Sequence, residues 1–224
     1  TVIANAPTRF LVSGMGDALS CCSEARATAA SYAKVNAGLP CGVREGVCPP
    51  AVGTNTALAL ATLCYQTLLA DGVKAKFACE SNKVTSSLEN IIEANILLSG
   101  LGFESAGLGG AHAIHDGLTI LPGTHKYFHG EKVAFGTLAQ LVLENAPTEE
   151  IEEVLSFCQK VGLPMCLADI GVDTISQEEL MEVAEKSCIP EESIHTLPFP
   201  VKPEAVAAAI LVANSIGSAF QKRG

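Results

Sequence analysis

The sequence predicts a mainly α-helical protein. Apolar residues recur at spacings of three and four along most of the chain, as in an amphipathic helix, and runs of strict alternation are scarce. Hydrophobic residues make up 48% of the 224 positions and are spread evenly, without a charge block, a low-complexity tract or a Ser/Pro-rich linker. We therefore expect a single helical domain over residues 1–224.

The first six residues depart from the helical pattern. Thr1–Ala6 form a short apolar run of β type, and the sequence indicates no partner strand downstream. Because a lone strand is not stable, this segment is either a residual strand from a sheet supplied by missing upstream sequence or a disordered end. We favour the residual strand.

Two helices are predicted in the first half of the chain. The first covers about residues 54–70, where leucines recur on one face and Asp71-Gly72 is typical of a helix stop. The second follows the apolar stripe from Val84 to Leu98 and is expected to end at Gly100.

Two further helix starts are indicated in the second half. Ser176-Gln177-Glu178-Glu179 matches a capping box, in which the serine oxygen and the glutamate carboxylate accept hydrogen bonds from free amides. Pro203-Glu204 suits a helix start, because the first helical position needs no N–H donor and an acid is stabilised at the positive end of the dipole. The predicted buried face of this last helix comprises Val206, Ile210, Ala213, Ile216 and Phe220.

Charge and hydropathy argue against several partners. The net charge is −10 and the basic residues are scattered, so we expect no nucleic-acid partner. The longest apolar run, Ala205–Val212, is shorter than the ~20 residues that cross a bilayer, so we expect no membrane span. The first residues lack the basic and long apolar regions of a signal peptide, which predicts a cytoplasmic location.

The nine cysteines include no C-x-x-C pair, and we interpret most of them as buried thiols. Cys41 and Cys48 have a spacing that would permit a loop-closing disulfide, although reduced thiols suit a cytosolic protein better.

Histidines cluster in one segment. Phe103–Glu131 holds four of the five histidines in 29 residues, and no cysteine. The first two are three residues apart, on one helical face, and the other two follow a break at Pro122-Gly123. Two helices can therefore direct imidazoles at one point. The four are His112, His115, His125 and His129.

This density indicates a metal site. A catalytic zinc site holds the metal with three protein ligands and leaves one position open, whereas a structural site has four ligands, commonly cysteines. His112 lies in a predicted apolar helix, Ala106–Ile114, where an imidazole needs a partner, and its alternative role is a hydrogen-bonded core histidine. His129 precedes a predicted helix start, and its alternative role is a capping or loop residue. His115 and His125 could orient ligands, carry protons or lie on the surface.

Asp17 is the best carboxylate candidate. It follows two glycines in SGMGDALS, where a helix is expected to begin and a turn could face a cleft. The alternative is that Asp17 only stabilises the positive end of that helix.

Four segments resemble one known family. AGLGGAHAIHDGLT, HGEKVAFGTLAQLVLENA, SGMGDAL and CESNKVTSSLENIIEANILLSGLGFES are similar to the glycerol dehydrogenases of the iron-containing alcohol dehydrogenase family, and the similarity covers nearly the whole chain. The resemblance implies the helical second domain of these enzymes, which is like that of dehydroquinate synthase.

The resemblance implies a role for individual residues. Asp17, His112 and His129 would bind one divalent metal, which is zinc in the glycerol enzymes and often iron in their relatives. Cys21 takes the place of a fourth ligand of the iron enzymes and is expected to be a packing residue here. His115 corresponds to a histidine near the nicotinamide and is the catalytic candidate. We expect zinc, with iron as the alternative.

The implied reaction is the oxidation of glycerol, or a similar small polyol, to dihydroxyacetone with NAD. In this family NAD binds to an upstream α/β domain, which we expect to be missing here. The glycines at 14, 16, 107, 109 and 110 do not follow a strand in a βαβ unit, so they are predicted to serve helix packing or metal approach. The chain alone is therefore expected to be inactive.

Loss of a domain would uncover an apolar face, so we expect a homo-oligomer, as the resemblance also implies. Two alternatives remain open. One is a non-catalytic helical oligomerisation module that keeps the metal site, and the other is a closed structural zinc site, in which loss of the metal would also unfold the chain.

Overall fold

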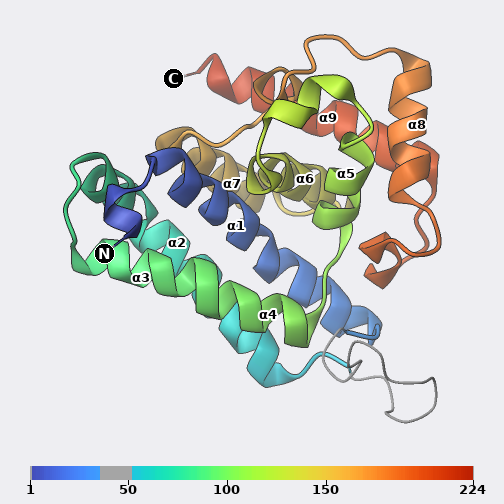
Figure 1. Ribbon diagram of the computed structural model, residues 1–224. Helices are drawn as coiled ribbons and strands as arrows, with labels where there is room; N and C mark the ends of the chain where they lie inside the picture. The colour runs from blue at the N-terminus through green and yellow to red at the C-terminus, as the bar shows by residue number, and fades with distance from the viewer. Residues whose placement is uncertain (1, 36–51, 224) are drawn as a thin grey trace.

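A computed structural model describes residues 2–35 and 52–223 of the chain (Figure 1). Within these residues the elements are helices, and the β-type pairing is limited to an isolated antiparallel bridge between Lys34 and Val52. The predicted mainly-α class is confirmed. Cys41 and Cys48 lie outside the described residues.

Three long helical segments lie side by side in the first half of the molecule (Figure 1). The third of them is interrupted by one π-helical stretch, η2, and then continues as an α-helix. The segments are α1 (Thr8–Ser31), α2 (Asn55–Glu80), and the succession α3 (Ser86–Glu93), η2 (Ala94–Leu98) and α4 (Ser99–Ala106).

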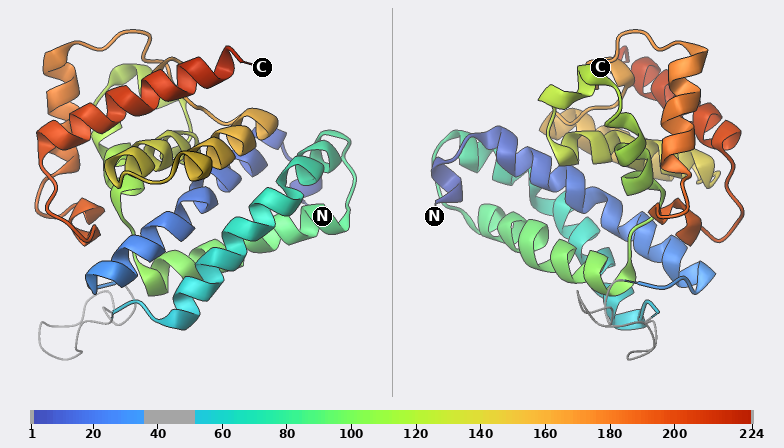
Figure 2. Two further views of the ribbon diagram at one scale, coloured as in Figure 1. Left: turned by 180° about the vertical axis from the view of Figure 1, so that it is seen from behind. Right: turned by 45° about the vertical axis from the view of Figure 1, so that its right-hand side comes forward.

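The second half wraps around one buried helix, α6, which packs against α1, α5 and α9. Figure 2 shows α8 and α9 on the side of the molecule away from α2. Every residue of α6 from Gly130 to Leu141 is buried, as expected for a helix at the centre of a core. The elements are α5 (Gly110–Leu118), η3 (Pro122–Lys126), α6 (His129–Leu143), α7 (Thr148–Val161), η4 (Leu167–Ile170), α8 (Gln177–Ser187), η5 (Ser193–Thr196) and α9 (Pro203–Gln221).

The residual strand predicted at the N-terminus is wrong. Ile3–Asn5 form a single 3₁₀ turn, η1, which packs against α2 and buries Ala4. The amides of Asn5 and Ala6 donate to the carbonyls of Val2 and Ile3 at 3.1 Å. These local bonds satisfy the backbone without a partner strand, and docking onto α2 explains Ile3 and Ala4, whereas Val2 is 88% exposed.

Two predicted helix ends are also wrong, and both had been placed at a glycine. Helix α2 continues past Gly72 to Glu80, because Gly72 provides room for the Phe157 ring, 2.7 Å from where a Cβ would lie. The next helix continues past Gly100 to Ala106, and its C-cap is Gly107, where φ is +87°. A left-handed backbone, which favours glycine, therefore marks the real end.

The two helix starts in the second half are confirmed. Ser176 accepts a hydrogen bond from the amide of Glu179 at 3.1 Å, and Glu179 accepts one from the amide of Ser176 at 2.9 Å. Helix α9 begins at Pro203. Its predicted face packs into the core, with Val206, Ile210 and Ala213 fully buried and Ile216 and Phe220 partly buried.

By length and composition alone, α2 and α9 are long and apolar enough to cross a membrane, and the bent pair Ser86–Ala106 with Gly110–Leu118 would add a third span. The sequence analysis considered only the longest unbroken apolar run, and the expected absence of a membrane span stays a prediction. Both helices also supply the core of the fold, where Leu68 of α2 and Ile210 of α9 are 0% exposed.

Candidate metal centre

Asp17 lies in the middle of α1, not at a helix start. Its predicted alternative role at the positive end of a helix is therefore wrong. Helix α1 crosses α6 in backbone contact at Gly16 and Gly130, where a Cβ on Gly130 would overlap the Ser13 carbonyl and lie 2.8 Å from the Asp17 amide. The two glycines thus serve close helix packing, and this crossing brings the first residue of α6, His129, beside Asp17.

A sharp bend places His112. The axes of Ser86–Ala106 and Gly110–Leu118 differ by 101°, and the chain turns through Gly107 and Gly109 between them. His112 is consequently the third residue of the short helix α5, instead of an interior residue of a helix from Ala106 to Ile114. The bend directs its ring back towards α1.

The three predicted ligands converge. Asp17 Oδ1 lies 3.2 Å from His112 Nε2 and 3.1 Å from His129 Nε2. One ligand atom from each residue lies within 4.8 Å of the others. The His112 side chain is 13% exposed, whereas those of Asp17 and His129 are 40% and 52% exposed, so the group opens to solvent on one side.

The donor set fits a divalent cation. One carboxylate oxygen and two imidazole nitrogens suit zinc, and the same combination suits iron(II). Among the residues that the structure describes, the group contains no thiol. Three protein donors around an exposed opening match a catalytic site better than a closed structural one.

Glu24 was not predicted from the sequence. It lies on α1 seven residues after Asp17, which is two helical turns along the same face, and its side chain is 0% exposed. Its Oε2 is 2.8 Å from His112 Nδ1, on the side of the ring away from Asp17. The sequence feature that could have indicated Glu24 is an acidic residue seven positions after Asp17 in a stretch of small residues.

These contacts set the charges in the cluster. Burial opposes a positive charge on His112, but the carboxylates of Glu24 and Asp17 outweigh it and raise the pKa of His112 to about 11. Burial likewise opposes the charge on Asp17, but hydrogen bonds from His112 and His129 hold the pKa of that carboxyl well below its usual range. In the metal-free chain, His112 therefore carries protons on both ring nitrogens and is positively charged near pH 7.

The remaining histidines of the segment are not among the three converging donors. His115 is buried, with Nδ1 2.9 Å from Asp116 Oδ1 and its ring edge-on to His129 at a centroid distance of 4.2 Å. His125 is exposed in η3, and its Nε2 is 2.9 Å from the Thr119 carbonyl.

Cys21 is a packing residue in this structure. It is 5% exposed, and its Sγ lies 3.2 Å from Ser99 Oγ on α4. A hydrogen bond with a neighbouring thiol, Cys64 on α2, and then burial hold its pKa well above the usual range of a thiol. A protonated thiol that faces α2 and α4 is a poor metal ligand.

A cavity of about 490 Å³ adjoins His112 and His129. Acidic side chains from α5 and from the segment before η5 line it, and Lys34 supplies a cation. Its lining residues are Lys34, Gly107, Leu108, His112, Asp116, His129, Glu191, Glu192, Ser193 and Thr196.

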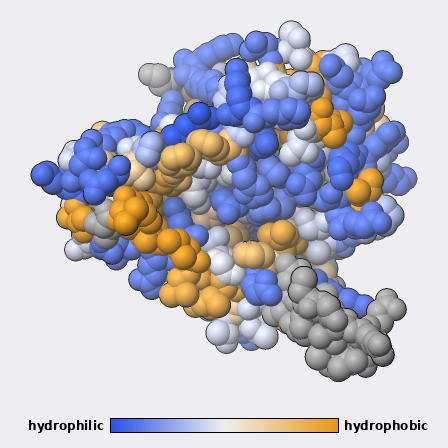
Figure 3. All heavy atoms as spheres, viewed as in Figure 1, coloured by the Kyte–Doolittle hydropathy of each residue, from blue (hydrophilic) through white to orange (hydrophobic). Residues whose placement is uncertain are grey.

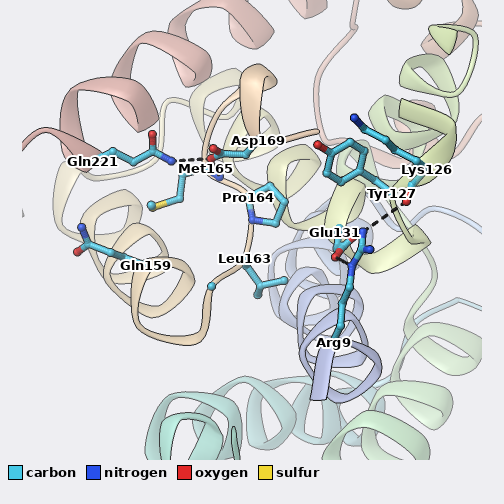
Figure 4. A pocket seen from close by; sticks show the side chains of 11 residues that line it. Arg9, Lys126, Tyr127, Glu131, Gln159, Leu163, Pro164, Met165, Asp169 and Gln221 are labelled. Atoms are coloured by element: carbon cyan, nitrogen blue, oxygen red, sulfur yellow. Dashed lines mark hydrogen bonds and ion pairs between the residues drawn. The ribbon is translucent and has the colours of Figure 1, made fainter. Parts of the chain in front are cut away.

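A larger cavity, of about 650 Å³, is lined by Arg9 of α1 and Glu131 of α6 (Figure 4). Three of its charged groups already have partners: Arg9 donates to Glu131 at 2.6 and 2.7 Å, and Gln221 donates to Asp169 at 2.6 Å. None of the three converging residues lines this cavity. The smaller cavity is thus the one beside the candidate centre.

Comparison with known proteins identifies the family. No family model matches the chain. It is 54% identical over 222 residues to a glycerol dehydrogenase of Citrobacter freundii, and the match covers 99% of this chain. The chain belongs to the glycerol dehydrogenases of the iron-containing alcohol dehydrogenase family. The resemblance noted in the sequence is thereby confirmed.

Solved structures of glycerol dehydrogenases share the fold. The crystal structure of the Schizosaccharomyces pombe glycerol dehydrogenase matches with a TM-score of 0.91 and 38% identity over 99% of this chain. That of a probable glycerol dehydrogenase from Sinorhizobium meliloti matches with a TM-score of 0.87 and 46% identity over 96%. The chain spans 54% to 58% of the length of these relatives and corresponds to their C-terminal part.

Proposed function

We propose that this chain is the metal-binding part of a glycerol dehydrogenase, which oxidises glycerol to dihydroxyacetone with NAD when the protein is complete. The observation that supports this most is the convergence of Asp17, His112 and His129 from three helices, in a chain 54% identical to a glycerol dehydrogenase. We place NAD binding in a part of the protein outside these 224 residues.

We propose zinc as the metal, with iron as the alternative, and these three residues as its ligands. When bound, a divalent cation supplies Lewis acidity, which lowers the pKa of an alcohol and favours loss of hydride. The chain's part is to hold the cation with Asp17, His112 and His129 and to leave its solvent-facing side open to the substrate. The exposure of Asp17 and His129 provides that opening.

The cavity beside the centre suits a neutral polyol. Asp116, Glu191 and Glu192 place acceptors along its wall. The hydroxyls of Ser193 and Thr196 donate to the carbonyls of Gly109 and Leu108 at 2.7 and 2.8 Å, which leaves their lone pairs free to accept. Hydroxyl groups of a polyol can donate to such a wall, whereas carboxylate or phosphate substrates are repelled.

We propose that His115 contributes to catalysis through His129. Burial, and then the positive charge of His129, lower the pKa of His115 to about 4, so its ring is neutral near pH 7. A neutral ring packed edge-on against His129 restricts the rotation of that ligand. His115→Ala would then lower kcat with glycerol and leave the KM for NAD unchanged.

We also propose that the chain self-associates. Apolar side chains of the η2–α4 segment are exposed, with Ile96 at 64%, Leu97 at 50%, Leu101 at 45% and Phe103 at 38%. An apolar area follows the helix from α3 to α4 on the surface (Figure 3). Exposed apolar area of this kind is typical of an interaction surface. Light scattering of the purified chain should give at least twice the 23.2 kDa mass of one chain, and a mass of 23.2 kDa would contradict self-association.

The test of the proposed function uses the complete protein that contains these residues. Purified with zinc, it should reduce NAD when glycerol is added, and Asp17→Asn should abolish both bound metal and glycerol-dependent NADH formation. Metal binding without any reduction of NAD by glycerol or other small polyols would contradict the proposal and favour a non-catalytic module.

A further inference from the structure

Glu24 lies behind His112 and is fully enclosed by hydrogen-bond donors. Its Oε1 accepts from the amides of Gly109 at 2.8 Å and His112 at 3.0 Å. Its Oε2 accepts from Ser20 Oγ at 2.9 Å and lies 2.8 Å from His112 Nδ1. Each oxygen therefore has two partners, which compensates for the burial of a charged carboxylate.

The first pair of contacts caps helix α5. The residue at the N-cap is Gly109, which has no side chain, so α5 begins without a cap of its own. Glu24, more than 80 residues earlier in the chain, accepts hydrogen bonds from two of the amides that would otherwise lack partners. Gln140 of α6 accepts from a third amide at this end, that of Ala111, at 2.7 Å. Glu24 and Gln140 thus hold the start of α5 together, and Glu24 also contacts the ring of His112.

The second pair of contacts fixes the ring of His112. An ionised carboxylate can only accept hydrogen bonds, so His112 Nδ1 must carry the proton in the contact with Glu24. In a neutral imidazole the lone pair then lies on Nε2, the atom that faces Asp17 at 3.2 Å. Nε2 is the atom required for a ligand at the proposed centre.

We propose that Glu24 is a positioning residue for the metal, which presents His112 Nε2 to the cation and couples cation binding to the order of the α5 N-terminus. This inference rests on the proposed metal centre. Removing such a carboxylate partner of a ligand histidine typically weakens metal binding about 10- to 100-fold.

The experiment compares zinc affinity in matched variants of the chain, measured by competition with a chromophoric chelator. Glu24→Gln keeps the size of the side chain, but its amide can turn an N–H towards Nδ1 and allow the proton to sit on Nε2. Its zinc dissociation constant should rise about 10- to 100-fold. Nitrogen-15 NMR of the zinc-loaded wild-type chain should show His112 with a proton on Nδ1 and zinc on Nε2, a result that does not depend on any variant.

Asp169→Asn is the matched control. Asp169 also accepts from two backbone amides, those of Met165 at 2.9 Å and Cys166 at 3.2 Å, and from the side chain of Gln221. It contacts no histidine in these bonds. This variant should lower the melting temperature as a lost cap does, and leave zinc affinity within twofold of wild type.

The outcomes separate the two proposals. A wild-type chain that binds no zinc would overturn the proposed centre, and the role of Glu24 with it. A wild-type chain that binds zinc, together with a Glu24→Gln variant of equal affinity or an NMR spectrum with zinc on Nδ1, would overturn the role of Glu24 alone.

Discussion

The crossing of α1 and α6 at Gly130 gives the sharpest test of how the fold builds the centre. A methyl group at position 130 would overlap the carbonyl oxygen of Ser13 and lie 2.8 Å from the amide nitrogen of Asp17. Gly130→Ala therefore forces α6 away from α1. Because Asp17 lies on one helix and His129 on the other, the change should disturb the metal centre without altering any ligand.

The magnitude follows from the geometry. The distance from the new Cβ to the Asp17 amide must lengthen from 2.8 Å to at least 3.4 Å, an ordinary contact. Overpacking of this kind costs about 1–3 kcal/mol. For a chain of this size that corresponds to a fall in Tm of about 2–12 °C. Metal–ligand distances tolerate about 0.2 Å, so zinc affinity should fall by about tenfold or more.

Gly100→Ala is the control, since none of the described atoms lies within 4 Å of a Cβ at that position in α4. It should stabilise the metal-free chain by about 0.5–1 kcal/mol and leave zinc affinity unchanged. Thermal unfolding and chelator competition measure both effects. A Gly130→Ala variant that melts and binds zinc like the wild type would refute the argument that this backbone contact sets the distance between Asp17 and His129.

Four further results are expected. The pKa of His112 in the metal-free fold is about 11, above its ordinary 6.5, so zinc must displace a proton to bind there. Zinc affinity should therefore increase about tenfold per pH unit between pH 6 and 8, and a pH-independent affinity would contradict this. Because the pKa of His112 is higher in the fold than in the unfolded chain, its protonation stabilises the metal-free chain fully below pH 6.5. This stabilisation is lost as the pH rises towards 11, so Tm should decline over that range. Glu192 lines the cavity, so Glu192→Gln in the complete protein should improve kcat/KM for an anionic analogue such as glycerate about fivefold relative to glycerol. Glu182 is exposed and serves as the control, so Glu182→Gln should not change this ratio. Equal behaviour of the two variants would rule out charge selection by the cavity wall. Cys21→Ala should retain zinc, because Cys21 Sγ faces Ser99, and should cost about 1 kcal/mol through the small cavity it leaves; loss of zinc would make Cys21 a ligand.

The sequence predicted what depends on local pattern. Helical periodicity identified the class, and the capping box at Ser176 and the proline at 203 marked true helix starts. A segment dense in histidine, together with the resemblance to a known family, predicted a metal site with donors from Asp17, His112 and His129. The structure brings these three donors together. These features need only neighbouring residues to be recognised.

What the sequence did not predict depends on contacts between distant segments. Gly72 and Gly107 look alike in the sequence, yet one makes room for the Phe157 ring and the other takes a left-handed backbone that ends a helix. Glu24 acts on residues more than 80 positions away, so its role became visible only once α5 was seen to begin at a glycine without a cap of its own. The roles of these residues depend on contacts with distant segments of the chain, and the periodicity of the sequence does not reveal such contacts.

The central claim is that one carboxylate and two imidazoles from three helices hold a single divalent cation. X-ray absorption spectroscopy of the zinc-loaded chain tests it most directly, because it reports the number and type of ligand atoms. We predict one zinc per chain with nitrogen and oxygen ligands at about 2.0–2.2 Å, two imidazoles among them, and loss of this signal in Asp17→Asn. A shell with sulfur at about 2.3 Å, or zinc retained unchanged in that variant, would contradict the account.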